Sequence, residues 1–194
     1  MKERRVFLVH GWGEKPDGNW FSWIKGELEK NGFKVIAPEM PDTNFPKVGA
    51  WVEKLREEVG HLDKDTYFIG HSMGCQTIMR TIESFKEKER CGGAVFVAGW
   101  IQILEMPNLS AEESEIVKSW IKGDVDFGKV KHILGASVAI FSDNDPFIPL
   151  EQEKLFRDKL GAKTIVQHAR GHFTARDGIT EFPLALQELL EVAG

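Results

Sequence analysis

A serine lies between two glycines in the stretch TYFIGHSMGCQTIM, residues 66–79. A short apolar run precedes GHSMG, residues 70–74, and a pattern typical of a helix follows it. This G-x-S-x-G pattern at a strand-to-helix turn exposes a serine hydroxyl for nucleophilic attack. A side chain at either glycine would crowd the neighbouring strand and helix while the serine backbone is held in a strained turn. Ser72 is therefore a candidate nucleophile, although Gly-rich turns also occur for packing alone.

A serine hydroxyl is a weak nucleophile near neutral pH, so this hypothesis requires a histidine base and an orienting carboxylate. Four of the six histidines suit the role poorly. His61 and His132 lie in polar connections, His71 occupies the variable position of GHSMG, and His10 precedes the first turn. His168 lies close to a predicted strand. His172 follows Gly171 in a loop that is free to reach Ser72, and we favour it as the base.

The candidate acids follow an earlier apolar run, in the stretch SDNDPFIP, residues 142–149. Aspartates in such loops often only cap turns. Asp145 precedes a proline, which favours an extended backbone and fixes the loop. We favour Asp145, and the spacing alone leaves Asp143 open. The chain order Ser72, Asp145, His172 is the one found in α/β-hydrolases.

A second Gly-rich stretch, His10-Gly11-Trp12-Gly13, follows the first predicted strand. Its glycines allow the backbone to approach a ligand, and the N–H groups of Trp12 and Met73 together form a predicted oxyanion hole. An ordinary strand-to-loop turn is the alternative. We predict substrate contacts from His10, Gly11 and Trp100. Four apolar residues are candidates for the wall of an acyl site, although aromatic residues at strand ends more often belong to the core: Trp12, Trp100, Ile101 and Ile103.

Short, nearly continuous apolar runs alternate with amphipathic segments along the chain, which is typical of a parallel sheet covered on both faces. The predicted strands are Arg5 to Val9, Lys34 to Ala37, Thr66 to Ile69, Ala94 to Ala98, Ser137 to Phe141 and Thr164 to Gln167. Apolar residues at helical spacing lie between them. Ser110 and Glu113 form a capping-box pattern, and another helix is expected near Leu150 to Leu160. Residues 100–135 have room for one helix and a loop, so no large lid is expected.

The amino-acid composition limits the classes of protein to which the chain can belong. The 194 residues are 42% hydrophobic and 28% charged, which suits one domain over residues 1–194 and excludes disordered, collagenous and membrane classes. A net charge of −5 argues against nucleic acid as a partner. The apolar run Val6 to Val9 is too short for a signal sequence or a membrane span, and we expect a cytoplasmic protein. Cys75 and Cys91 have neither disulfide nor metal-site spacing.

Several stretches together resemble the small serine hydrolases of the retinoblastoma-binding protein 9 and YdeN-like type, within the α/β-hydrolase superfamily. They are GHSMG, the MPD of residues 40–42 followed by a helix carrying Trp51, the loop DNDPFIP and the terminal RGHF. The resemblance implies an α/β-hydrolase fold, Ser72 as nucleophile, Asp145 as acid and His172 as base, and it favours Asp145 over Asp143. The HGWG stretch departs from this family and is more similar to broader lipase and esterase patterns.

We therefore expect hydrolysis of a small ester or activated acyl substrate through an acyl-serine, with no metal or organic cofactor. A catalytically idle protein that uses the same pocket for binding is the alternative. The sequence leaves protein partners undetermined.

Overall fold

The computed structural model describes residues 3–102 and 109–194. Within these ranges six strands form one parallel sheet with the order β2-β1-β3-β4-β5-β6. The strands are β1 (Arg5–Val9), β2 (Lys34–Ile36), β3 (Thr66–His71), β4 (Gly93–Val97), β5 (Ala136–Ser142) and β6 (Lys163–Gln167). The central strands are buried on both faces, as their apolar sequences predict.

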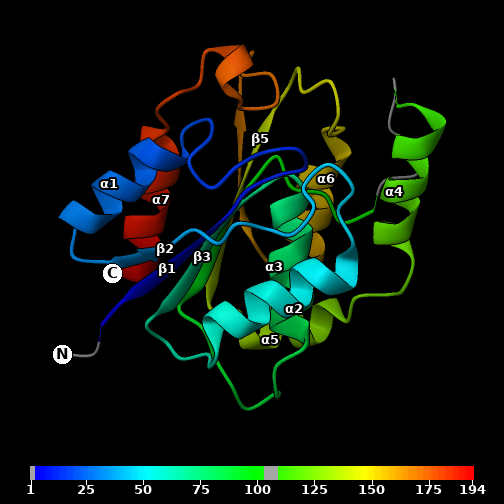
Figure 1. Cartoon of the computed structure of the whole chain (residues 1–194). Coiled ribbons are helices and arrows are strands. Elements are labelled where there is room, and N and C mark those ends of the chain that lie inside the picture. Colours follow the sequence, from blue (N-terminus) through cyan, green and yellow to red (C-terminus); the bar gives the residue numbers. More distant parts are fainter. Residues whose placement is uncertain (1–2, 103–108) are drawn as a thin grey trace.

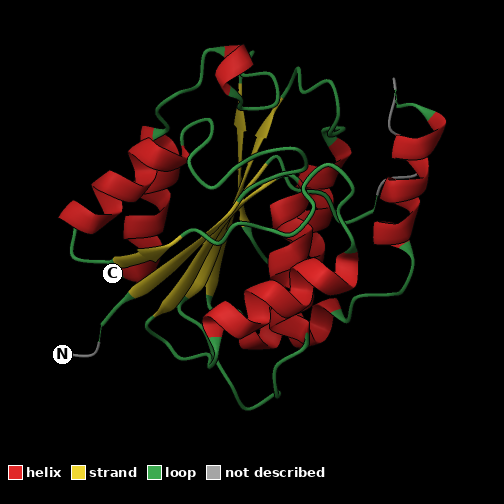
Figure 2. Cartoon of the chain, in the orientation of Figure 1, coloured by secondary structure: helices red, strands yellow, loops and turns green. Residues whose placement is uncertain are grey.

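Helices cover both faces of the sheet (Figures 1 and 2). The helix α1 (Phe21–Lys30) and the C-terminal α7 (Pro183–Ala193) lie on one face, where α7 packs on β4 and β5. The opposite face carries α2 (Val48–Val59), α3 (Met73–Glu83), α5 (Phe127–Ile133), α6 (Glu151–Leu155) and the π-helical turn η1 (Phe156–Leu160). The helix α4 (Ala111–Ile121) lies beside this second layer, and the 3₁₀ turn η2 (Ala175–Asp177) precedes α7.

The strand order reverses between β1 and β3. The chain passes from β1 outward to β2 and then returns to the other side of β1 as β3. At such a switch point the loops that follow the two strands diverge and leave a crevice at the carboxyl edge of the sheet. The loop that carries Trp12 follows β1, and Ser72 follows β3, so the topology brings the two predicted parts of the site to this crevice.

Most element predictions agree with the structure to within one or two residues. The capping box of Ser110 and Glu113 at the start of α4 is confirmed, with both reciprocal hydrogen bonds present. One prediction is wrong: residues 100–135 contain two helices, α4 and α5, rather than one. The Asp126 side chain caps α5 by accepting the N–H of Lys129, and Val130 and Ile133 are buried. This helix has only 7 residues, about two helical turns, so its apolar periodicity is brief in the sequence.

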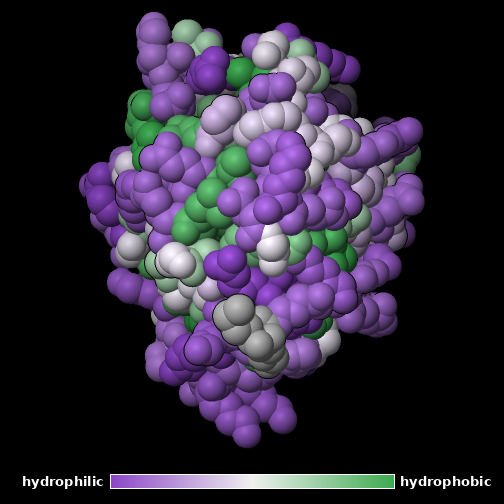
Figure 3. Space-filling view, turned by 90° about the vertical axis from the view of Figure 1, so that its left-hand side faces the viewer, coloured by the Kyte–Doolittle hydropathy of each residue, from purple (hydrophilic) through white to green (hydrophobic). Residues whose placement is uncertain are grey.

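The face that carries α1 and α7 is mostly hydrophilic, with its hydrophobic residues in small areas (Figure 3). Among the described residues, no helix is both long enough and apolar enough to cross a bilayer.

Candidate active site

The turn after β3 holds Ser72 in a strained backbone conformation. Its φ is 51° and its ψ is −116°, a region that costs a residue with a side chain about 1–3 kcal/mol. Ser72 is the N-cap of α3, but its hydroxyl does not cap the helix. Its backbone N–H instead donates to the carbonyl of Val97 in the next strand (2.9 Å). The fold therefore fixes the backbone of this residue and leaves its hydroxyl available.

The two glycines that flank this turn are required by close packing, as the sequence predicts. A Cβ at Gly74 would lie 2.1 Å from the carbonyl oxygen of Val9 at the end of β1. A Cβ at Gly70 would lie 2.7 Å from the Ile78 side chain and 3.0 Å from the Cys75 nitrogen in α3. Helix α3 therefore begins directly against the end of β1, which places its N-terminus at the crevice.

His172 and Asp145 form a buried pair from the two loops that follow β6 and β5. We call residues 168–174 the base loop and residues 143–149 the acid loop. The Nδ1 of His172 lies 2.8 Å from Oδ2 and 3.0 Å from Oδ1 of Asp145, and the side chains are 12% and 2% exposed. Oδ1 of Asp145 also accepts the N–H groups of Phe147 and Ile148. Since a carboxylate only accepts hydrogen bonds, Nδ1 carries a proton and Nε2 of the imidazole is left to act as a base.

Further hydrogen bonds hold the acid and base loops together. The Asn144 side-chain oxygen accepts the N–H of Gly171 (2.8 Å) and the hydroxyl of Ser142 (2.7 Å). Asp143 accepts the N–H of Ala169 (2.8 Å) through one oxygen and lies 2.7 Å from the His168 ring through the other. These contacts join the two loops independently of the contact between His172 and Asp145.

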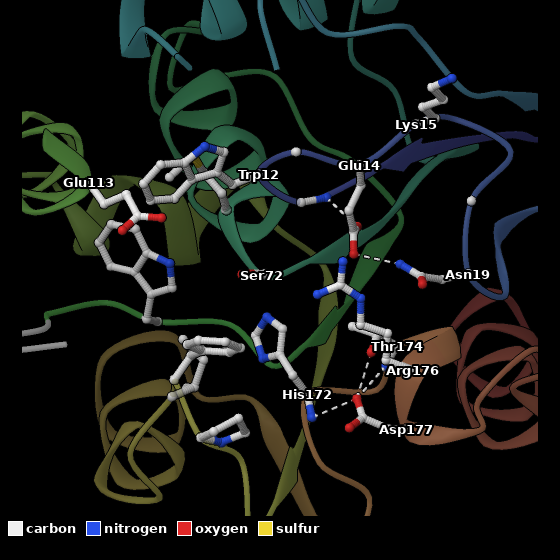
Figure 4. A pocket seen from close by; sticks show the side chains of 18 of the residues that line it. Trp12, Glu14, Lys15, Asn19, Ser72, Glu113, His172, Thr174, Arg176 and Asp177 are labelled. Atoms are coloured by element: carbon white, nitrogen blue, oxygen red, sulfur yellow. Dashed lines mark hydrogen bonds between the residues drawn. The ribbon is translucent and has the colours of Figure 1, made fainter. Parts of the chain in front are cut away.

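Ser72 and His172 line the same cavity, which has a volume of about 770 Å³. Figure 4 shows the His172 imidazole pointing from the base loop toward Ser72. The Phe147 ring packs edge-on against this imidazole, with ring centroids 5.1 Å apart. The structure thus brings the predicted nucleophile, base and acid to one place, with the acid behind the base.

Trp12 and Met73 also line this cavity. Within the described part of the chain, neither backbone N–H donates a hydrogen bond. Met73 is the first residue of α3, where the helix leaves N–H groups unpaired and its dipole favours negative charge. These two N–H groups suit an oxyanion that forms at Ser72.

The cavity has two chemically different walls. One wall is mainly apolar and comes from the acid loop, the segment after β4 and the α4 region, with Glu113 as its charged residue: Trp100, Leu109, Glu113, Val117, Pro146, Phe147 and Ile148. The other is polar and comes from the loop after β1 and the segment after His172: Glu14, Lys15, Asp17, Asn19, Thr174, Arg176 and Asp177. Among the sequence predictions, Gly11 and Trp100 lie at the cavity. The contribution of Phe147 and α4 was missed, because apolar residues in a loop and on a helix look like core residues in a sequence.

The prediction of a substrate contact from His10 is not supported by its position. His10 is fully buried and is not among the residues that line the cavity. Its Nδ1 donates to the carbonyl of Gly11 (2.9 Å), and its Nε2 accepts the N–H of Met40 (3.4 Å). Burial lowers the pKa of His10, so the ring is neutral and ties two loops together. Ile101 is likewise buried away from the cavity, and Ile103 lies outside the described residues.

Cys75 lies three residues after Ser72 but is not a second nucleophile. The side chain is fully buried, and its thiol donates to the carbonyl of Val97 (3.5 Å). Burial strongly raises the pKa of this thiol, so it stays protonated. Among the described residues, no group of three or more His, Cys, Asp or Glu side chains is arranged to hold a metal ion.

The chain is similar to known hydrolases along most of its length. The family model described as serine hydrolase matches residues 6–191. The chain is 27% identical to the hydrolase YdeN of Bacillus subtilis over 187 residues, which is 96% of this chain and 94% of YdeN. It is also 27% identical to the serine hydrolase RBBP9 of Rattus norvegicus over 165 residues, which is 84% of this chain and 83% of RBBP9.

Solved structures show the same fold. The crystal structure of the Bacillus subtilis ydeN gene product superposes with a TM-score of 0.89 at 24% identity and covers 97% of this chain and 98% of that one. The 2-hydroxy-6-oxo-6-phenylhexa-2,4-dienoate hydrolase of Rhodococcus superposes with a TM-score of 0.68 at 15% identity and covers 98% and 90%.

Proposed function

Because the chain belongs to the serine hydrolase family and has the α/β-hydrolase fold, we propose that it hydrolyses small esters or other activated acyl compounds through an acyl-serine. Ser72 is the proposed nucleophile, His172 the base and Asp145 the residue that orients it. The observation that carries the proposal is the shielded His172–Asp145 pair, whose imidazole points toward the Ser72 hydroxyl, which does not cap α3.

In the proposed mechanism, His172 takes the proton of the Ser72 hydroxyl as the oxygen attacks the acyl carbonyl. The N–H groups of Trp12 and Met73 stabilise the oxyanion, and each such donor is typically worth about a hundredfold or more in rate. His172 then protonates the leaving alcohol and activates a water molecule for deacylation. Asp145 holds the proton on Nδ1 and stabilises the imidazolium that forms.

The two walls of the cavity suggest how a substrate lies. The apolar wall, which includes Trp100 and Phe147, suits an acyl chain, because apolar surface is favourably removed from water. The polar wall, which includes Lys15 and Arg176, suits a hydrated leaving alcohol. A volume of about 770 Å³ lies in the range of small-molecule sites.

The test is a series of p-nitrophenyl esters from acetyl to decanoyl, assayed with the wild-type protein and Ser72→Ala. We expect the wild-type protein to turn over the short esters best and the variant to show no turnover above the buffer rate. Folded wild-type protein that binds but hydrolyses none of them would instead support a catalytically idle binding protein, and equal rates in the two proteins would remove Ser72 from the reaction.

A further inference from the structure

The residue directly before the nucleophile is a buried histidine whose two ring nitrogens both face oxygen acceptors. The His71 side chain is fully buried. Its Nδ1 lies 3.0 Å from Oε2 of Glu14, and its Nε2 lies 2.8 Å from the backbone carbonyl oxygen of His172. A carbonyl oxygen and an ionised carboxylate only accept hydrogen bonds, so the ring must carry a proton on each nitrogen to make both.

The carboxylate of Glu14 extends this contact to the loop that follows β1. Its Oε2 also accepts the N–H of Gly11 (2.8 Å), the residue before Trp12, and its Oε1 accepts from the side chain of Asn19 (2.5 Å). The Asn19 side-chain oxygen in turn accepts the N–H of Ala175, just beyond the base loop (2.9 Å). One network therefore joins the turn that carries Ser72 (the nucleophile turn), the loop after β1 that carries Trp12, and the base loop.

The charge state of the pair follows from these partners. Burial alone would raise the pKa of Glu14, but the charge and hydrogen bond of His71 and the N–H of Gly11 outweigh it and lower the pKa to about 2. Burial alone would lower the pKa of His71, but Glu14, the His172 carbonyl and Asp145 together raise it. The other titratable rings that face it are His172, with ring centroids 4.9 Å apart, and His10.

We propose that Glu14 and His71 form a buried carboxylate–imidazolium pair that positions the catalytic groups by fixing the carbonyl of His172 and the N–H of Gly11 relative to Ser72. His71 and Glu14 are positioning residues in this account, because they act through their neighbours and Ser72 does the chemistry. The inference rests on the proposed function for its catalytic consequence, whereas the charge state of the pair stands independently of it.

The reason for a charged pair is geometric. A neutral His71 has one nitrogen without a proton, which would face an oxygen lone pair at either Glu14 or His172. One of the two loops would then move away from the nucleophile turn. Misplacement of a catalytic group by about 1 Å can reduce the rate about a hundredfold, so the pair has a measurable role through the groups that it positions.

The first test uses the wild-type protein and needs no activity. Nitrogen-15 NMR distinguishes an imidazolium from a neutral imidazole at each histidine, and His10 serves as a buried internal control. At about pH 8, where an ordinary histidine is neutral, we expect both nitrogens of His71 to be protonated and His10 to carry one proton. A singly protonated His71 at that pH would overturn the proposal, whether or not the protein hydrolyses esters.

The second test uses Glu14→Gln, with Glu57→Gln on the exposed side of α2 as the control that removes a carboxylate elsewhere. We expect Glu14→Gln to lower kcat about tenfold to a hundredfold with KM within about twofold, to slow fluorophosphonate labelling of Ser72, and to abolish the imidazolium signal of His71. Unchanged kcat in a folded Glu14→Gln protein would contradict the positioning role.

A double variant separates positioning from a general loss of packing. In Glu14→Gln/His71→Gln, two neutral amides can keep the hydrogen bonds to the Gly11 N–H and the His172 carbonyl, while the acceptor for the Asn19 side chain is lost. We expect the double variant to be less impaired than the product of the two single effects, measured as kcat on the same ester. If the two single effects simply multiply in the double variant, the two residues act independently, and the proposed coupling between them is contradicted.

The contribution of the Glu14–His71 pair to the stability of the protein depends on pH. The Glu14 contribution is full above about pH 4.5 and is lost as the pH falls through the lowered pKa of about 2. The His71 contribution is full below about pH 6.5 and is lost as the pH rises through its raised pKa. The difference in Tm between the wild-type protein and Glu14→Gln should therefore be largest at about pH 5 to 6. A difference that grows toward alkaline pH would contradict the assigned charges.

Discussion

Two aspartate–histidine pairs connect the same two loops, and they differ in surroundings far more than in length. The Asp145–His172 contact is 2.8 Å and the Asp143–His168 contact is 2.7 Å. The first pair is 2% and 12% exposed, whereas the second is 36% and 90% exposed. Only His172 of the two histidines lines the cavity with Ser72.

The comparison teaches that two pairs of nearly equal length can differ in burial and in position relative to the cavity. In water the attraction between exposed charges is weak and screened. The Asp143–His168 contact therefore adds little to the stability of the fold beyond the hydrogen bond from the Ala169 N–H to Asp143, which joins the two loops. The Asp145–His172 pair is shielded, and its carboxylate is fixed by two backbone N–H groups. A fixed, shielded carboxylate holds one tautomer of the imidazole and stabilises its charged form.

The largest expected effect comes from replacing the base. His172→Gln should lower kcat/KM for p-nitrophenyl acetate by about 10⁵ or more, since the serine loses its proton acceptor. His168→Gln, the same change on the exposed pair, should leave kcat/KM within about threefold. Equal losses in the two variants would remove the distinction between the pairs.

The acids should differ in the same way, with a smaller loss. Asp145→Asn keeps the shape of the side chain but favours the wrong tautomer of His172, and kcat should fall by about 10⁴. Asp143→Asn should change kcat by less than about threefold. Steady-state kinetics with circular dichroism as a folding control decides this, and a comparable loss at Asp143 would reopen the assignment of the acid.

A third test moves the base loop without touching either pair. A Cβ at Gly171, where φ is +57°, would lie 2.2 Å from Oδ1 of Asp177, so Gly171→Ala must shift the base loop. We expect kcat to fall about tenfold to a hundredfold. Gly178→Ala is the matched control, because its φ of +80° is also left-handed but no atom lies within 4 Å of the added Cβ. A loss of kcat as large in Gly178→Ala would attribute the effect to backbone strain in general.

The smallest effect concerns the exposed pair and pH. The Ala169 N–H and then His168 lower the pKa of Asp143, so its contribution to stability is present above about pH 3.8 and is lost as the pH falls through the lowered pKa. Asp143→Asn should reduce Tm by at most about 2 °C at neutral pH, and the difference should vanish in strong acid. A Tm difference that grows in acid would contradict the sign.

Much of the fold and the main residues of the site were predictable, because their signals are local. The strands were visible as apolar runs, and Ser72, Asp145 and His172 follow strands whose carboxyl ends meet at one edge of the sheet. The GHSMG and DNDPFIP stretches carry turn chemistry that a sequence displays directly.

The rest depends on contacts between distant residues. Glu14 and His71 are 57 positions apart, and no spacing rule connects them, so His71 looked like a variable residue. The predicted substrate contact of His10 is not supported, because its side chain is turned into the core against Trp51. The side on which a residue near a strand end points is decided by packing, which one sequence does not display.

Labelling of Ser72 by a fluorophosphonate, followed by mass spectrometry of the labelled peptide, tests the central assignment most directly. The account predicts rapid labelling of Ser72 in the wild-type protein and in His168→Gln, and labelling slower by several orders of magnitude in His172→Gln. An adduct on another residue, no adduct in the folded wild-type protein, or equal labelling rates in the two histidine variants would contradict it.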